Sequence, residues 1–146
     1  MIGIKTKDEV YFVADTLGSI DLVERAHILL IYDVAGYLKS LDFVETLEGK
    51  MVVPSHSQAT THIKPVVEFN RITMYEIMDV ILDYLKEEHN CTECCSHIFD
   101  HYGLRITYNK YLLILSTVRS YLSYLSNSKR IKNYFKDNRI VFINEE

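Results

Sequence analysis

Two neighbouring stretches decide the predicted fold: His97 to Leu104, which reads HIFDHYGL, and Thr107 to Lys110, which reads TYNK. Glycine readily adopts the left-handed backbone that ends a helix, and threonine is a common N-cap. We therefore expect Gly103 to end one helix and Thr107 to begin the next. Beyond Thr107, apolar residues recur every three or four positions on one helical face: Tyr111, Leu115, Val118, Leu122 and Leu125. The sequence thus predicts two helices joined by a tight turn.

Two capping boxes lie upstream of this turn. Asn90-Cys91-Thr92-Glu93 predicts the start of the helix that ends at Tyr102. In such a motif the first and the fourth side chains can each accept a hydrogen bond from a free backbone amide. Thr73-Met74-Tyr75-Glu76 predicts another helix in the same way, from Met74 to about Glu88. Three helices therefore follow one another in the second half of the chain.

A hairpin is expected after the third helix. Residues 130–135 and 139–143 flank Lys136-Asp137-Asn138, where asparagine tolerates the positive φ of a tight turn. Three helices, a glycine-containing turn and a hairpin resemble the winged helix-turn-helix domains of bacterial and viral transcription regulators. The resemblance covers about half of the chain and consists of a pattern of elements.

The resemblance implies a set of DNA-contacting residues, because in that family the third helix enters the major groove and the hairpin follows the backbone. On the helix these are the polar residues Thr107, Asn109, Lys110, Ser116, Thr117 and Ser120. On the hairpin they are the basic residues Lys129, Arg130, Lys132, Lys136 and Arg139. Two alternatives stay open: the helix face is merely solvated, or the lysines guard an exposed edge strand against pairing.

The charge distribution favours contact with a polyanion at one end only. Residues 101–146 carry eight Lys or Arg against three Asp or Glu, whereas residues 1–100 carry eight against seventeen. Such a split between halves is typical of a nucleic-acid surface or of a surface for an acidic partner. The acidic first half is therefore assigned to dimerisation or partner binding.

The first half gives weaker structural signals. Residues 7–17 fit either a short helix or a strand, and Ser19 is a plausible N-cap for a helix that extends to about Leu41. Phe43-Val44-Glu45-Thr46-Leu47 and Met51-Val52-Val53 suggest a strand, a turn and a strand. The polar stretch from Pro54 to Pro65 is interpreted as a connector, and Val66 to Phe69 as a short strand.

These elements predict a mainly α fold with small β-hairpins (α+β). Residues 1–53 form an N-terminal helical and hairpin region, residues 54–72 a connector, and residues 73–146 the winged helix-turn-helix domain. A loose similarity between the two halves leaves open a second winged helix in the first half.

A cluster of thiols and imidazoles competes with the DNA-binding interpretation. Residues 89–101 contain three Cys and three His, which are ligand types that zinc prefers. The candidate ligands are Cys91, Cys94, His97 and His101, with His56 and His62 as distant additions. The alternative is that Cys95 is a small buried residue and the histidines form an exposed face. No metal and no cofactor is assigned.

The predicted function is a DNA-binding transcriptional regulator, expected to be a homodimer with a further protein partner through its first half. The alternatives are a protein-protein interaction module on a winged-helix fold and a metal- or thiol-responsive regulator. No phosphate-binding glycine loop or nucleophile elbow occurs, so no enzyme is expected. The odd cysteine count, the absence of a signal-peptide segment and the absence of a membrane span predict a cytoplasmic protein.

Overall fold

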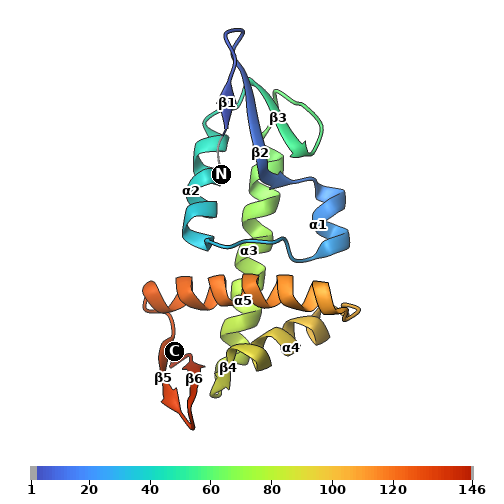
Figure 1. Cartoon of the computed structure of the whole chain (residues 1–146). Coiled ribbons are helices and arrows are strands. Elements are labelled where there is room, and N and C mark those ends of the chain that lie inside the picture. Colours follow the sequence, from blue (N-terminus) through green and yellow to red (C-terminus); the bar gives the residue numbers. More distant parts are fainter. Residues whose placement is uncertain (1–2, 146) are drawn as a thin grey trace. The chain divides into compact units, whose positions relative to one another are not determined.

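The computed structural model describes residues 3–145 of the chain (Figure 1). Its elements, in chain order, are β1 (Ile4–Lys5), β2 (Val10–Gly18), α1 (Ile20–Ala26), α2 (Val34–Glu45), β3 (Met51–His56), α3 (Lys64–Tyr84), β4 (His89–Asn90), α4 (Cys91–His101), α5 (Tyr108–Asn127), β5 (Lys132–Lys136) and β6 (Arg139–Ile143). Contacts divide the described chain into two compact units: residues 3–27 with 35–74, and residues 28–34 with 75–145. The expected domain boundaries at residues 53 and 73 stay a prediction, since these units are defined by contacts and not by independent folding.

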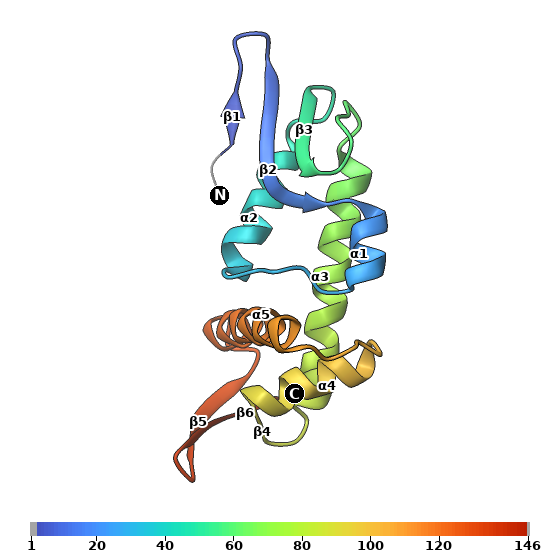
Figure 2. The ribbon, with the colours of Figure 1, turned by 45° about the vertical axis from the view of Figure 1, so that its right-hand side comes forward.

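The first unit is built on a mixed three-stranded sheet. Strand β2 lies between β1, which is antiparallel to it, and β3, which is parallel to it (Figure 2). The segment left open between helix and strand, residues 7–17, is therefore mostly strand. Fully buried apolar side chains from strands, from helices and from the residue just before α3 form the core of this unit: Leu17, Leu41, Val52, Ile63 and Val67.

The single helix predicted from Ser19 to Leu41 is two helices. Ser19 does cap α1, with its hydroxyl accepting from the amide of Leu22 at 3.2 Å. His27, however, has a φ of +58°, a left-handed conformation that ends α1. Helix α2 begins only at Val34, and residues 28–34 belong to the second unit.

The start of α3 is also different from the prediction. The helix begins at Lys64, so the predicted strand at residues 66–69 is helical and Thr73 lies inside the helix. There the Thr73 hydroxyl donates to the carbonyl of Phe69 at 2.9 Å instead of capping. The capping is done from a distance by Glu48, whose Oε2 accepts from the amides of Ile63 and Lys64 at 2.9 and 3.0 Å. These backbone hydrogen bonds lower the pKa of Glu48, and the one from the Lys64 amide has the largest effect.

The second unit contains the elements that the sequence predicted best. The capping box of Asn90 and Glu93 is confirmed, Gly103 has a φ of +58°, and the Thr107 hydroxyl accepts from the amide of Lys110 at 3.3 Å. Strands β5 and β6 form the predicted hairpin, with Asp137 and Asn138 at φ values of +49° and +59°. A two-residue strand, β4, pairs with β6 and extends the hairpin to a three-stranded sheet.

Helices α4 and α5 supply the core of this second unit. Their buried side chains include Cys95, Ile98, Phe99, Tyr121 and Leu125. Among the described residues, no helix combines the length and the apolar character needed to cross a membrane.

Candidate functional site

Two residues of the predicted DNA-reading face of α5, Thr117 and Ser120, are covered by the protein itself. Thr117 is 1% exposed, and its hydroxyl accepts from the amide of Ile31 at 3.1 Å and donates to the carbonyl of Leu29 at 3.2 Å. The Ser120 hydroxyl accepts from the amide of Val34 at 3.0 Å. Residues 28–34 therefore lie on this face, and neither Thr117 nor Ser120 can reach a base edge.

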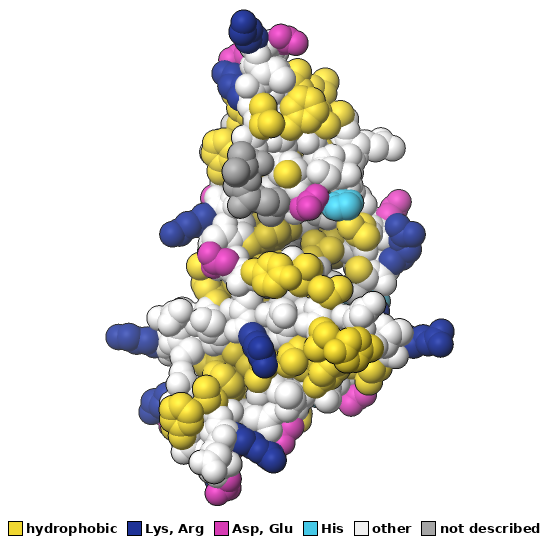
Figure 3. Space-filling view, in the orientation of Figure 1, with side chains coloured by type: hydrophobic (Ala, Val, Ile, Leu, Met, Phe, Trp, Pro, Cys, Tyr) yellow, Lys and Arg dark blue, Asp and Glu magenta, His cyan; other side chains and the backbone are white. Residues whose placement is uncertain are grey.

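The hairpin lysines are matched by carboxylates. Lys132 pairs with Glu145, and Lys136 pairs with Glu88, which also accepts from the Tyr134 hydroxyl. The Lys136 and Tyr134 hydrogen bonds lower the pKa of Glu88, so its carboxylate stays charged beside them. On the face drawn in Figure 3, the Lys and Arg side chains stand apart from one another and do not gather into one basic patch.

The other predicted DNA contacts are spread over the second unit. Exposed members are Thr107, Asn109, Lys129 and Arg139, and half-buried members are Lys110, Ser116 and Arg130. Thr107 is occupied as the N-cap of α5.

The cysteine and histidine cluster does not converge on one point. Cys94 and Cys95 are buried, and burial raises the pKa of their thiols to about 12 and about 11. The His97 ring stacks on Tyr84, with ring centroids 4.0 Å apart, and burial followed by nearby His101 lowers its pKa. Among the described residues, no three or more His, Cys, Asp or Glu are grouped so that they could hold a metal ion.

A carboxylate and an imidazole meet in the first unit instead. Asp15 lies on β2 and His56 ends β3, and Asp15 Oδ1 is 3.3 Å from His56 Nε2. Both side chains are more than half exposed. Strands β2 and β3 run parallel, so the pair lies toward their carboxyl ends, the edge at which open α/β sheets bind their ligands.

An irregularity in β2 accompanies this placement. Ala14, just before Asp15, has a φ of +47°, which is unfavourable for a residue with a Cβ. The pairing of β2 with β3 shifts register on both sides of Ala14. Such bulges re-aim the side chains beside them, and strained backbone tends to concentrate at functional sites. The local backbone thus sets the direction of Asp15.

A buried amide fixes the end of β2 next to His56. Asn70 is 2% exposed; its Oδ1 accepts from the amide of Gly18 at 3.1 Å and its Nδ2 donates to the carbonyl of Gly18 at 2.8 Å. Gly18 is the register partner of His56. The Tyr37 hydroxyl donates to the same Asn70 oxygen at 3.1 Å, and burial raises the pKa of Tyr37. Asn70 therefore holds the strand end that positions His56.

The pair can transfer a proton, but it is too small to be a metal centre. A carboxylate that bonds one imidazole nitrogen leaves the other nitrogen free to act as a base. A zinc ion in a protein takes typically about three or four protein ligands. Asp15 and His56 provide two donors, and no described group of three exists, so the described residues do not form a metal site.

Sequence reasoning missed Asp15 and assigned His56 only as a remote metal ligand. The one local signal is a histidine three residues after the predicted Met51 to Val53 strand, in a polar stretch. The partner carboxylate is found only through the parallel pairing of two strands that are separated by two helices.

Two solved structures share the fold over nearly the whole chain. A beta-lactamase domain protein from Burkholderia ambifaria is similar over 97% of this chain, with a TM-score of 0.77 and 15% sequence identity. A metallo-beta-lactamase family protein from Thermus thermophilus is similar over 98%, with a TM-score of 0.70 and 13% identity. The chain spans 43% and 44% of these two proteins, less than half of their length. No family model and no curated protein matches the sequence.

These structures correct the predicted fold class. The proteins that share the fold carry beta-lactamase names and are not winged helix-turn-helix DNA-binding domains, so that resemblance is wrong. The mainly α description with small hairpins is wrong as well, because nine-residue β2 pairs in parallel with β3 in a mixed sheet. A reading of local periodicity does not reveal a parallel pair, since its strands are distant in sequence.

The predicted function depended on the winged-helix fold and is contradicted together with it. A DNA-binding regulator, an interaction module on a winged helix and a metal- or thiol-responsive regulator are all wrong, and so is the DNA partner. The homodimer expected beside it loses its basis, because the apolar run is buried in its own chain, with Ile28 8% and Ile31 5% exposed. The prediction that the chain is not an enzyme is contradicted as well, because the two proteins that share the fold carry beta-lactamase names.

Proposed function

We propose that this chain is part of a hydrolase and that Asp15 and His56 are the pair of side chains that take part in the reaction. The observation that carries the proposal is the position of the pair, at the carboxyl ends of adjacent parallel strands in a fold shared with beta-lactamase-type proteins. The proposal concerns cleavage of an acyl bond by water, which is the reaction class that the names of those proteins denote.

His56 is the base in this proposal. Asp15 Oδ1 lies 3.3 Å from His56 Nε2, and a carboxylate beside that nitrogen favours the tautomer in which Nε2 carries the proton and Nδ1 the lone pair. Nδ1 takes a proton from a water molecule as the water oxygen attacks the acyl carbon, and the imidazolium then returns this proton to the leaving group as its bond to the acyl carbon breaks. The charge that then forms on the imidazole is stabilised by the Asp15 carboxylate beside it. The exposure of both side chains leaves room for water and substrate.

Metal-assisted hydrolysis would need more than this chain's described residues. Asp15 and His56 would contribute two donors, and further donors would have to come from elsewhere. An assay with added zinc and an assay with a chelator therefore separate hydrolysis by the pair alone from hydrolysis that depends on a metal.

The test measures hydrolysis of a chromogenic ester and a chromogenic β-lactam by the whole chain and by two matched variants. His56→Gln removes the base and should slow hydrolysis on the order of 10²-fold, the usual contribution of a positioned base. His62→Gln is the matched control, because His62 Nδ1 also lies 3.3 Å from a carboxylate, that of Glu48, but away from the strand ends. Equal rates in the two variants would contradict the proposal.

A further inference from the structure

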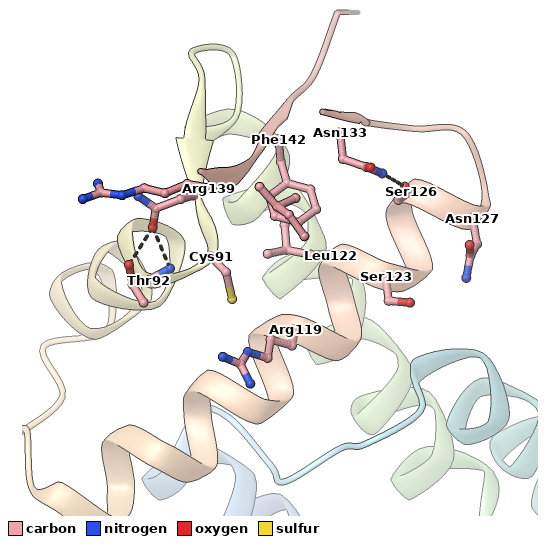
Figure 4. A pocket seen from close by; sticks show the side chains of 12 residues that line it. Cys91, Thr92, Arg119, Leu122, Ser123, Ser126, Asn127, Asn133, Arg139 and Phe142 are labelled. Atoms are coloured by element: carbon pink, nitrogen blue, oxygen red, sulfur yellow. Dashed lines mark hydrogen bonds between the residues drawn. The ribbon is translucent and has the colours of Figure 1, made fainter. Parts of the chain in front are cut away.

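The second unit contains a pocket of about 920 Å³ that the proposed hydrolytic pair does not use. Its walls come from three places: the start of α4, the later turns of α5 and the hairpin of β5 and β6 (Figure 4). One hydrogen bond joins the Asn133 side chain on the hairpin to the Ser126 hydroxyl on α5. The hairpin is therefore fastened to the helix across one edge of the pocket.

The charge on the pocket wall has one sign. Arg119 and Arg139 line the pocket, and no Asp or Glu lies among the lining residues that the structure describes. Neither guanidinium forms an ion pair within residues 3–145, unlike the hairpin lysines, which are matched by Glu145 and Glu88. In a chain whose net charge is -4, this wall is a local site of unmatched positive charge. A guanidinium binds carboxylates well because it offers a planar, bidentate set of donors.

Apolar side chains form another part of the wall. Leu122 from α5 and Phe142 and Ile140 from β6 line the pocket, and Ile140 is 46% exposed. Figure 4 shows the side chains of Phe142 and Leu122 next to each other in the middle of the pocket. Neutral polar groups, among them Ser123 and Asn127, complete the lining. Ligand sites commonly combine such apolar surface with a few polar or charged groups that fix orientation.

We propose that this pocket binds an organic anion with an apolar body, of the class of medium-chain carboxylates. The carboxylate contacts Arg119, and the hydrocarbon chain covers Leu122, Ile140 and Phe142. Burial of these apolar surfaces supplies affinity, and the unmatched arginines select the sign of the charge. This site is separate from the Asp15 and His56 pair, which belongs to the other unit.

A thiol on the pocket wall provides a reporter. Cys91 lines the pocket and is half-buried, whereas Cys94 and Cys95 are buried. In Figure 4 the Cys91 sulfur points toward Arg119. Burial raises the pKa of Cys91, and nearby Arg119 opposes that rise. A maleimide at mildly alkaline pH should therefore label Cys91 before the other two cysteines.

The experiment uses dodecanoate and the whole chain. Its binding is measured by calorimetry, below the concentration at which dodecanoate forms micelles, and the rate of Cys91 labelling is followed by mass spectrometry. We expect dodecanoate to bind and to slow the labelling of Cys91 by about fivefold or more as the pocket fills. Acetate, which has the head group without the chain, and dodecyltrimethylammonium, which has the chain with the opposite charge, should do neither. Equal binding of dodecanoate and dodecyltrimethylammonium would overturn the proposal.

Three variants localise the site. Arg119→Gln should weaken dodecanoate binding by about tenfold, the effect of one lost charge-assisted hydrogen bond pair. Arg105→Gln removes the same charge from an exposed position outside the pocket and should change nothing. Ile140→Ser should also weaken binding, and because Ile140 is exposed the fold should survive. Equal affinities in Arg119→Gln and Arg105→Gln would overturn the proposal. His56→Gln should bind dodecanoate normally, so loss of hydrolysis and loss of binding are separate outcomes.

Discussion

At the scale of single residues, Asn70 makes the clearest contribution to the site. Its buried amide bonds both backbone groups of Gly18, and its oxygen also accepts from the Tyr37 hydroxyl. Replacement by Ala leaves these buried partners unsatisfied, and a buried polar group without a partner costs about 1–3 kcal/mol. We expect Asn70→Ala to lower the free energy of unfolding by at least this amount, as measured by urea denaturation.

A matched surface variant gives the comparison for Asn70. Asn109→Ala removes the same amide group at an exposed position on α5 and should change stability by less than about 0.5 kcal/mol. If the two variants are equally stable, Asn70 does not hold the end of β2.

His97 makes stability depend on pH. Its pKa is lowered in the fold, first by burial and then by His101, while the unfolded chain keeps the ordinary value of 6.5. The unfolded chain therefore binds a proton at His97 more readily than the folded chain does. The folded state is favoured by neutral His97 above pH 6.5, and this contribution to stability is lost as the pH falls from 6.5 through the folded-state pKa. The urea midpoint should be lower at pH 5.5 than at pH 7.5.

Substitution of His97 isolates its part of this pH dependence. His97→Gln cannot take up the proton, so its urea midpoint should fall less between pH 7.5 and pH 5.5. An identical fall in both proteins would assign the pH dependence to other groups.

Residue types alone predicted little of the candidate site. Three cysteines and three histidines in a short stretch draw attention to α4, yet two of those thiols serve as buried apolar groups. Asp15 and His56 are ordinary surface residues in the sequence, and only the pairing of β2 with β3 brings them to 3.3 Å. The information that identifies the pair is therefore tertiary.

At the scale of elements, the β5–β6 hairpin depends on its turn residues. Asp137 and Asn138 both have positive φ, which suits a primed turn and favours Asn, Asp or Gly. Asn138→Val places a β-branched residue in left-handed backbone and should cost about 1–2 kcal/mol. Asn138→Gly should keep the stability of the parent chain or raise it. If Val and Gly are equivalent at position 138, the turn does not have the described conformation.

The same scale shows which elements could be predicted. Helices α4 and α5 have local caps, Asn90 and Thr107, and both starts were predicted correctly. The start of α3 was not, because its cap is the side chain of Glu48, far away in the sequence. A search for local caps finds Thr73 instead, which lies inside the helix. Local signals therefore predict a helix start whose free backbone amides bond a nearby side chain in the sequence. They miss a helix start whose amides bond a side chain that is distant in the sequence.

At the scale of the whole molecule, the chain has two units, and their separate chemistry defines two separate tests. The first unit carries the Asp15 and His56 pair, and the second carries the pocket with Arg119 and Arg139. The DNA-binding prediction failed at this scale, because the hydrogen bonds of residues 28–34 to Thr117 and Ser120 are a property of the folded chain. Secondary-structure elements can therefore be predicted correctly while the residues that they expose to solvent are not.

The most direct test of the central claim is a double-mutant cycle on the rate of ester hydrolysis, with Asp15→Asn, His56→Gln and the combined variant. If the two side chains act as one unit, the combined variant is no slower than His56→Gln alone, since Asp15 acts only through the imidazole. Additive losses, with the combined variant slower by the product of the two single effects, would contradict the claim that Asp15 and His56 form one reactive pair.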